Sequence, residues 1–151
     1  MRPLIVYVSL HHGNTKKVAD AMAAKLQCQA LTPNHADITA LTEYDLLGFG
    51  SGLYFGPHHR SMLDFARALP PMSTKAFVFS TRGSWNVGRA HEPLKQSLKT
   101  KGLHVMGEFS CRGFDTVGPL KYIGGIARGR PNAQDLADAQ AFVRTLVNDE
   151  R

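Results

Sequence analysis

Residues 4–15 read LIVYVSLHHGNT, and this stretch decides the fold of the chain. Its first five residues are apolar and rich in β-branched side chains, which is typical of a strand buried on both faces. A turn that contains Gly13 follows, and apolar residues then recur at spacings of one, three and four from Val18 to Leu26. We therefore expect a strand, a glycine-containing loop and an amphipathic helix in direct succession.

The same succession recurs along the whole chain. Apolar runs predict further strands at residues 28–31, 46–50, 76–79 and 103–109. Apolar residues at helical spacing predict further helices marked by Met62–Leu69, Val87–Leu98 and Leu136–Leu146. Gly102 is expected to end the second of these helices, and the last is expected to begin near Pro131. Such alternation predicts one α/β domain over residues 1–151, with a parallel sheet covered by helices on both faces.

Length and composition fit a globular protein. The chain has 151 residues, of which 43% are hydrophobic, enough to form a buried core. No apolar run is long enough to span a bilayer, and the apolar start at Leu4–Val8 is too short for a secretory signal, so we expect a cytoplasmic protein without a membrane span. Cys28 and Cys111 are expected to be free thiols. A catalytic thiol at Cys111 is the less favoured alternative to a packed, inert one.

The formal net charge is +6, which favours an anionic ligand or a partner with an acidic surface. The basic residues are scattered and accompany no aromatic RNA-binding motif, so we expect no nucleic-acid partner. Six of them follow the fourth and fifth predicted strands, namely Arg82, Arg89, Arg112, Lys121, Arg128 and Arg130. They form either a positive rim around a ligand or an ordinary solvated surface.

Three polar, glycine-containing loops follow predicted strands. They span Ser9–Thr15, Ser51–Gly56 and Ser80–Trp85. In an open parallel sheet, ligands bind beyond the C-terminal ends of the strands, where the strand order reverses. The three loops together therefore indicate a ligand site at that edge of the sheet.

The first loop is suited to a phosphate group. Gly13 allows close backbone approach and a positive φ, and Asn14 and Thr15 stand where free helix N–H groups and the positive end of the helix dipole point outward. The alternative is that Asn14 or Thr15 only caps the helix. The loop lacks both the nucleoside-triphosphate pattern GxxxxGK[ST] and the dinucleotide pattern GxGxxG.

Aromatic and histidine side chains accompany the loops. Tyr54, Phe55 and Trp85 either stack on a planar cofactor or cover the edge of the sheet. The pairs His11-His12 and His58-His59 raise the question of a metal. Adjacent histidines rarely bind one ion and no acidic cluster accompanies them, so we expect phosphate hydrogen bonding or solvent exposure and no metal.

As a set, these motifs resemble the flavodoxin family. Residues 5–19 resemble its phosphate loop, residues 44–56 its second flavin loop and residues 79–83 its third. Residues 107–115 and 129–132 resemble the C-terminal signature of one flavodoxin-like subgroup. The resemblance covers nearly the whole chain.

The resemblance implies a three-layer sandwich around a five-stranded parallel sheet of order 2-1-3-4-5, with bound flavin mononucleotide (FMN). It implies phosphate contacts from Ser9, His11, His12, Gly13, Asn14 and Thr15. It implies ring contacts from Ser51, Gly52, Leu53, Tyr54, Phe55, Gly56, Thr81, Arg82, Gly83 and Trp85. Two features depart from many flavodoxins: Leu10 and His12 stand where hydroxyl residues are common, and this chain is basic where well-known flavodoxins are acidic.

Three functions follow from these features. The leading one is an FMN-binding electron carrier, in which the protein positions the flavin and tunes it electrostatically. The alternative is a small FMN-dependent oxidoreductase of the quinone or porphyrinogen type, with Arg82 or His59 orienting the substrate, although no acid–base pair is identifiable. The third is a flavodoxin-like binding or regulatory module that has lost its flavin. The sequence does not decide the oligomeric state.

Overall fold

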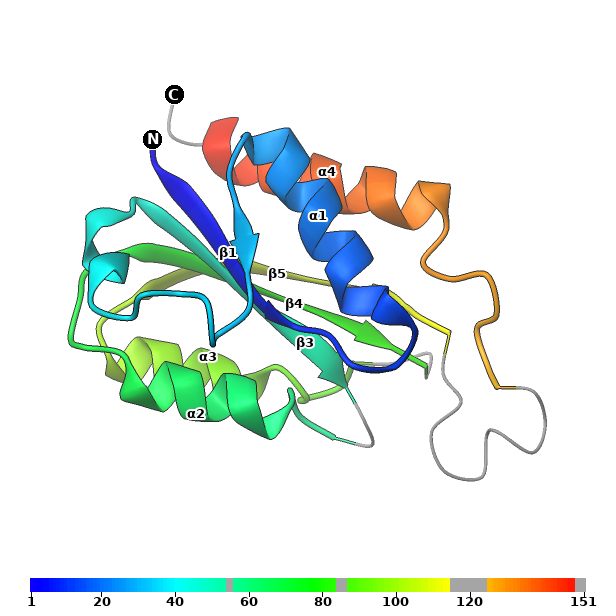
Figure 1. Ribbon diagram of the computed structural model, residues 1–151, viewed down its shortest axis with the longest axis horizontal. Coiled ribbons are helices and arrows are strands. Elements are labelled where there is room, and N and C mark those ends of the chain that lie inside the picture. Colours follow the sequence, from blue (N-terminus) through cyan, green and yellow to red (C-terminus); the bar gives the residue numbers. More distant parts are fainter. Residues whose placement is uncertain (54–55, 84–86, 115–124, 149–151) are drawn as a thin grey trace.

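A five-stranded parallel sheet forms the centre of the molecule in a computed structural model that describes residues 1–53, 56–83, 87–114 and 125–148 (Figure 1). Its strands are β1 (Pro3–Val8), β2 (Ala30–Leu31), β3 (Leu46–Leu53), β4 (Lys75–Arg82) and β5 (His104–Arg112). Their order across the sheet is β2-β1-β3-β4-β5, and every neighbouring pair is parallel. The predicted strand order is confirmed.

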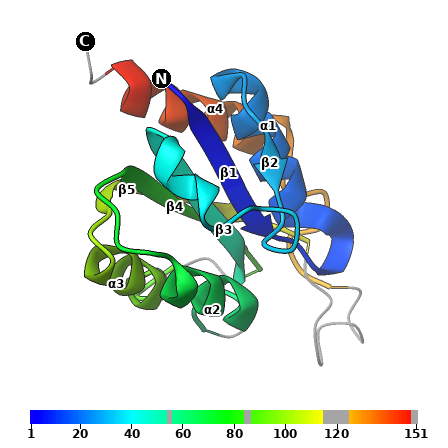
Figure 2. The same cartoon turned by 60° about the vertical axis from the view of Figure 1, so that its left-hand side comes forward.

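Helices cover both faces of this sheet. They are α1 (Asn14–Leu26), α2 (Arg60–Ala68), α3 (Glu92–Thr100) and α4 (Ala133–Asn148), with short 3₁₀ helices at His11–Gly13 and Ala40–Glu43. Figures 1 and 2 show α1 and α4 side by side on one face and α2 and α3 on the other. The predicted three-layer α/β sandwich is therefore confirmed. None of the described helices combines the length and the apolar character needed to cross a membrane.

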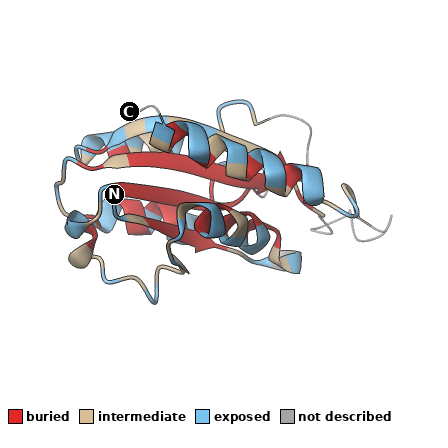
Figure 3. Ribbon diagram, turned by 90° about the horizontal axis from the view of Figure 1, so that it is seen from above, coloured by how far each residue is buried: buried red, intermediate tan, exposed pale blue. Residues whose placement is uncertain are grey.

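Alternation along the strands produces two apolar layers. On β1, Leu4 and Val6 pack with the α2 and α3 side, whereas Ile5 and Tyr7 pack with α1 and α4. Because side chains alternate across a strand, a sheet buried on both faces needs apolar residues at consecutive positions. Figure 3 shows the result as a buried sheet between helices whose outer faces are exposed.

The start of α3 differs from its prediction and its end matches it, each for a local reason. α3 begins at Glu92 and not at Val87, because Pro93 is suited to the first turn of a helix, where its missing N–H is not needed. The predicted stop at Gly102 is confirmed: its N–H donates to the Lys99 carbonyl and the Leu103 N–H to the Leu98 carbonyl. This pair of bonds is a Schellman motif.

The strands also differ from their predicted lengths. β3, β4 and β5 extend three residues beyond the predicted ends, to Leu53, Arg82 and Arg112, because each continues its pairing with a neighbour in register. β2 is shorter than residues 28–31, since the Cys28 N–H donates to the Ala23 carbonyl and closes the end of α1. The first residues of the second and third polar segments, predicted as loops, therefore belong to the sheet.

Two glycines in β3 make room for aromatic rings of β4. Gly48 and Gly50 are the Cα partners of Phe77 and Phe79, and both rings are fully buried. A Cβ atom at Gly48 would lie 2.4 Å from Phe77 Cζ, and one at Gly50 would lie 2.4 Å from Phe79 Cε2. The rings occupy the space that side chains of β3 would otherwise fill.

Substitution Gly50→Ala is therefore expected to lower the free energy of unfolding by about 1–3 kcal/mol, because the added methyl group overpacks a rigid core. Gly56→Ala is the matched control, since a Cβ atom there meets nothing within 4 Å, and it should change stability by less than about 0.5 kcal/mol. Urea unfolding followed by circular dichroism measures both. Equal midpoints for the two variants would show that the Phe79 ring moves aside without cost.

Candidate functional site

The three predicted loops meet at one edge of the sheet. β1, β3 and β4 are neighbours, and their register places Val8 beside Ser51 and Ser51 beside Ser80. The strands are parallel, so the segments that follow them leave from the same edge. The structure thus brings together the described parts of all three segments.

The first loop combines a tight turn with the start of α1. His11–Gly13 forms one turn of 3₁₀ helix, and both His12 (φ 60°) and Gly13 (φ 65°) adopt left-handed backbone conformations. α1 begins at Asn14, and Gly13 has no side chain with which to cap it. The predicted positive φ at Gly13 and helix start at Asn14 are confirmed.

The charges of this first helical turn favour an anion. It contains no acidic residue, and Lys16 and Lys17 follow directly. Lys16 pairs with Asp20 at 2.7 Å between Nζ and Oδ2, which raises the pKa of the ammonium group. The Ser9 Oγ accepts the Lys16 backbone N–H at 3.1 Å. Its hydroxyl hydrogen can still be donated outward.

A pair of hydroxyl groups joins the first loop to the third. Thr15 Oγ1 lies 2.8 Å from Thr81 Oγ1, and both residues are buried. Either oxygen can be the donor, so one hydroxyl of the pair always keeps a hydrogen for a further acceptor. The sequence analysis placed both residues at the site, and the tertiary structure places them in direct contact.

Phe114 connects the same loop to the segment after β5. Its carbonyl accepts the Asn14 Nδ2 amide at 2.7 Å, and its ring lies 4.4 Å from the His12 ring, centroid to centroid. Gly113 leaves space for this contact, because a Cβ atom there would lie 2.6 Å from Asn14 Nδ2. Phe114 was not predicted as a site residue. Gly113, which precedes Phe114 within the subgroup signature, is the sequence feature that could have indicated this contact.

The second segment is anchored through Ser51. Ser51, Gly52 and Leu53 are the last residues of β3 and not loop residues, which corrects the prediction. Ser51 Oγ donates to the Gly52 carbonyl at 2.9 Å and accepts the backbone N–H of His59 at 2.8 Å. Gly56 follows in the described chain, whereas Tyr54 and Phe55 lie outside the described residues.

The third segment is anchored by arginines. Thr81 and Arg82 belong to β4, which again corrects the predicted loop, and Gly83 follows it. Arg82 Nη1 donates to Ser110 Oγ at 2.8 Å, and Arg112 Nη2 donates to the Gly83 carbonyl at 2.8 Å. Burial lowers the pKa of Arg82 from its usual value. Trp85 lies outside the described residues.

Most arginines of the predicted rim interact with other groups of the protein. Besides Arg82 and Arg112, Arg130 forms two bonds to Asp135, and the Arg128 guanidinium lies 5.8 Å from the centre of the Phe114 ring. The Asp135 pKa is held below its usual value by these bonds, against the opposing effect of burial. Arg89 is exposed, and Lys121 lies outside the described residues.

The remaining candidate groups do not converge. His58 contacts the Phe79 carbonyl, whereas His59 Nδ1 accepts the Ser61 N–H and caps α2, so this pair points to separate partners. Nothing is described for the His11 side chain. Both cysteines are free, and burial raises the pKa of Cys28 to about 11 and that of Cys111 to about 12. Such thiols are poor nucleophiles at neutral pH.

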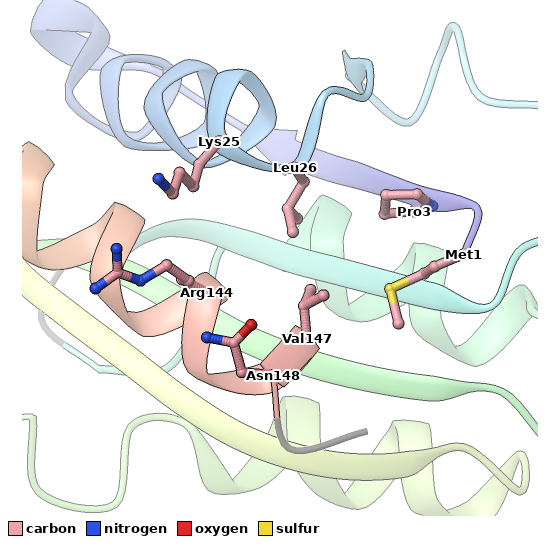
Figure 4. A pocket seen from close by; sticks show the side chains of 7 residues that line it. All are labelled: Met1, Pro3, Lys25, Leu26, Arg144, Val147 and Asn148. Carbon is pink, nitrogen blue, oxygen red and sulfur yellow. The ribbon is translucent and has the colours of Figure 1, made fainter. Parts of the chain in front are cut away.

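A hollow of about 160 Å³ lies at the other end of β1, between the C-terminal ends of α1 and α4 (Figure 4). Apolar Leu26 and Val147 line it, with Lys25 and Arg144 at its side. It is separate from the loops, because Pro3 at the beginning of β1 borders it.

Comparisons with known proteins agree with this arrangement. A family model described as a flavodoxin domain matches residues 4–116. An uncharacterized protein of Methanocaldococcus jannaschii is 37% identical over 150 residues, which are 99% of this chain and 100% of that protein.

Solved flavodoxins share the fold at low sequence identity. A flavodoxin from the domain Archaea superimposes with a TM-score of 0.74 at 19% identity, covering 99% of this chain and 98% of that one. Oxidised flavodoxin 2 from Bacillus cereus gives a TM-score of 0.74 at 17% identity, covering 99% of each chain. With the family model matching most of its length, the chain belongs to the flavodoxin family.

Proposed function

We propose that this protein binds FMN and acts as an electron carrier. The observation that carries the proposal is the start of α1, where an acid-free helical turn without a capping side chain at Gly13 opens at the edge where β1, β3 and β4 end. A helix N-terminus of this kind binds phosphate through its free N–H groups and its dipole. Membership of the flavodoxin family supports the assignment of that phosphate group to FMN.

The residues present suit such a ligand. Ser9 and the Thr15–Thr81 pair each keep a hydroxyl hydrogen for an acceptor. These donors, with the backbone of residues 11–15, would hold the phosphate group. They replace the hydroxyl groups that Leu10 and His12 lack.

The ends of β3 and β4 would hold the flavin ring. Ser51–Leu53 with Gly56, and Thr81–Gly83, line the same edge, and we assign Tyr54, Phe55 and Trp85 to the ring on the family resemblance alone. When bound, the flavin supplies reversible one- and two-electron transfer. The protein supplies position and an electrostatic environment that contains the Arg82 and Arg112 guanidinium groups.

The charge of the chain supports a partner with an acidic surface. A net charge of +6 raises the rate of encounter with a negatively charged protein, and this effect weakens as salt screens the charges. We accordingly assign the electron donor or acceptor to the class of acidic redox proteins. Turnover of NAD(P)H or a quinone by the purified protein would instead identify it as an FMN-dependent oxidoreductase.

The first test is the purified protein itself. Flavin absorption bands and recovery of FMN from the protein are expected, with the flavin held in a one-to-one complex. A colourless protein that does not take up added FMN would refute the proposal and favour a module without flavin.

Thr15→Ala is expected to weaken FMN binding by about 10–100-fold, because it removes a hydrogen bond to a charged phosphate group. Thr15→Ser keeps the hydroxyl and should bind nearly as the unaltered protein does. Thr145→Ala, in the exposed part of α4, controls for loss of a threonine elsewhere. Quenching of FMN fluorescence measures the dissociation constants, and an unchanged value for Thr15→Ala would remove Thr15 from the site.

The reduction potential tests the electrostatics. The fully reduced flavin is usually anionic, so nearby positive charge should make its formation less unfavourable than in an acidic flavodoxin. Arg82→Gln keeps a donor for Ser110 and removes the charge, so it should make the potential more negative. Arg144→Gln, beside the distant hollow, should leave the potential unchanged. Potentiometric titration that finds the low potential of an acidic flavodoxin would contradict this assignment.

A further inference from the structure

Two buried histidines lie behind the proposed flavin site and have no part in it so far. His58 follows β3 and pairs with Leu53 in an isolated antiparallel bridge, and His91 immediately precedes α3. Each is 2% exposed, and their ring centroids are 4.9 Å apart. One belongs to the segment after the second loop, the other to the segment after the third.

Both rings are attached to consecutive residues near the end of β4. His58 Nε2 lies 2.9 Å from the Phe79 carbonyl oxygen, and His91 Nε2 lies 2.7 Å from Ser80 Oγ. The carbonyl can only accept, so His58 Nε2 carries a hydrogen and donates it. The two segments are thereby held on one strand, at the level where the proposed ring site begins.

A chain of hydrogen bonds between hydroxyl and guanidinium groups leads on from Ser80. Ser80 Oγ lies 2.7 Å from Ser110 Oγ, and Ser110 Oγ accepts from Arg82 Nη1 at 2.8 Å. Displacement of His91 would leave Ser80 without its imidazole partner. His91 is therefore linked through two side chains, Ser80 and Ser110, to Arg82, a residue assigned to the flavin ring.

The environment favours neutral rings. The Nδ1 atoms of His58 and His91 are buried and have no hydrogen-bond partner among the described residues. Glu108 Oε1 is 3.9 Å from His91 Nδ1, but Lys95 binds the other oxygen of this carboxylate at 2.7 Å. A proton on either Nδ1 would thus place a charge in a buried position without a direct acceptor, and two charged rings would repel each other.

Charged groups around the pair do not offset this cost. Those facing it from β4, α3 and β5 are Arg82, Glu92, Lys95 and Glu108. Burial lowers the pKa of His58 from 6.5 to about 4, with the nearby His91 lowering it further and the Phe79 bond and Glu108 opposing. Burial also lowers the pKa of His91, with Lys95 and Arg82 adding to the effect and Glu108 and Glu92 opposing it.

Resting on the proposed function, we propose that His58 and His91 are positioning residues for FMN. The neutral imidazole rings of these two histidines hold the second and third flavin-binding segments on β4, and protonation of the rings releases the segments.

The direction of the pH dependence follows from proton binding. Above pH 6.5 the rings are neutral whether attached or released, so attachment is fully favourable. As pH falls from 6.5 toward about 4, the released form takes up a proton that the attached form of His58 does not. Acid therefore favours release, by up to about tenfold per pH unit for one proton.

The test compares the dissociation constant of FMN between pH 5 and pH 8 in the unaltered protein and in the double variant His58→Gln/His91→Gln. Glutamine keeps a donor at each position and cannot titrate. The FMN phosphate itself takes up a proton at about pH 6, and the effect of this proton on affinity is common to both proteins. Relative to its own affinity at pH 8, the unaltered protein should show an additional loss of up to about tenfold per pH unit below pH 6, and the double variant should show only the loss caused by the phosphate.

His104→Gln is the matched control, because His104 is exposed at the start of β5 and lies away from this edge. It should keep the pH profile of the unaltered protein. The same profile in the double variant as in the unaltered protein would overturn the proposal.

Hydrogen exchange tests the attachment without FMN or a variant. The His59 N–H donates to Ser51 Oγ and the Glu92 N–H to the Arg89 carbonyl, so both report on the held segments. Between pH 7 and pH 5 their protection factors should fall, while that of Phe77 in the centre of β4 persists. Unchanged protection at His59 and Glu92, or a simultaneous loss at Phe77, would overturn the proposal. Failure to bind FMN at any pH would refute the proposed function and leave this result interpretable.

Discussion

The parallel register of β1, β3 and β4 is the constraint on which the rest of the structure depends. It places Val8, Ser51 and Ser80 side by side, so that three segments distant in sequence leave the sheet together. The register is maintained by a close fit, since Gly48 and Gly50 admit the Phe77 and Phe79 rings. A shift of one residue between β3 and β4 would place Leu47, Phe49 or Ser51 opposite these rings in place of the glycines.

The buried polar side chains at the ends of the strands form hydrogen bonds with other groups of the protein. Thr15 bonds Thr81, Ser51 holds His59, and Ser80 connects His91 to Ser110. Each bond joins two different segments, and each lies at or near the ends of the strands. The edge is thus preorganised by short cross-links between loops, which reduces the entropy lost when a ligand binds there.

The sequence predicted the architecture well because its signals are local. Consecutive apolar residues at Leu4–Val8 indicate a strand buried on both faces, and Gly13 and Gly102 mark a turn and a helix end. Strand ends were predicted less well, since the continuation of β3 to Leu53 depends on pairing with β4. The same holds for β2, where the closing bond of α1 leaves only Ala30–Leu31 to pair.

The sequence by itself determined the strand–helix alternation, the three polar segments and the family resemblance, because these depend on residue types and on spacings along the chain. Only the tertiary structure decided the partners: the contact of Phe114 with His12 and Asn14, the Thr15–Thr81 pair and the buried pairing of His58 with His91. Their members are 33 to 102 residues apart, and no local pattern specifies which of several serines, threonines or histidines will meet. That choice is made by the strand register and by the burial that leaves each polar atom few partners.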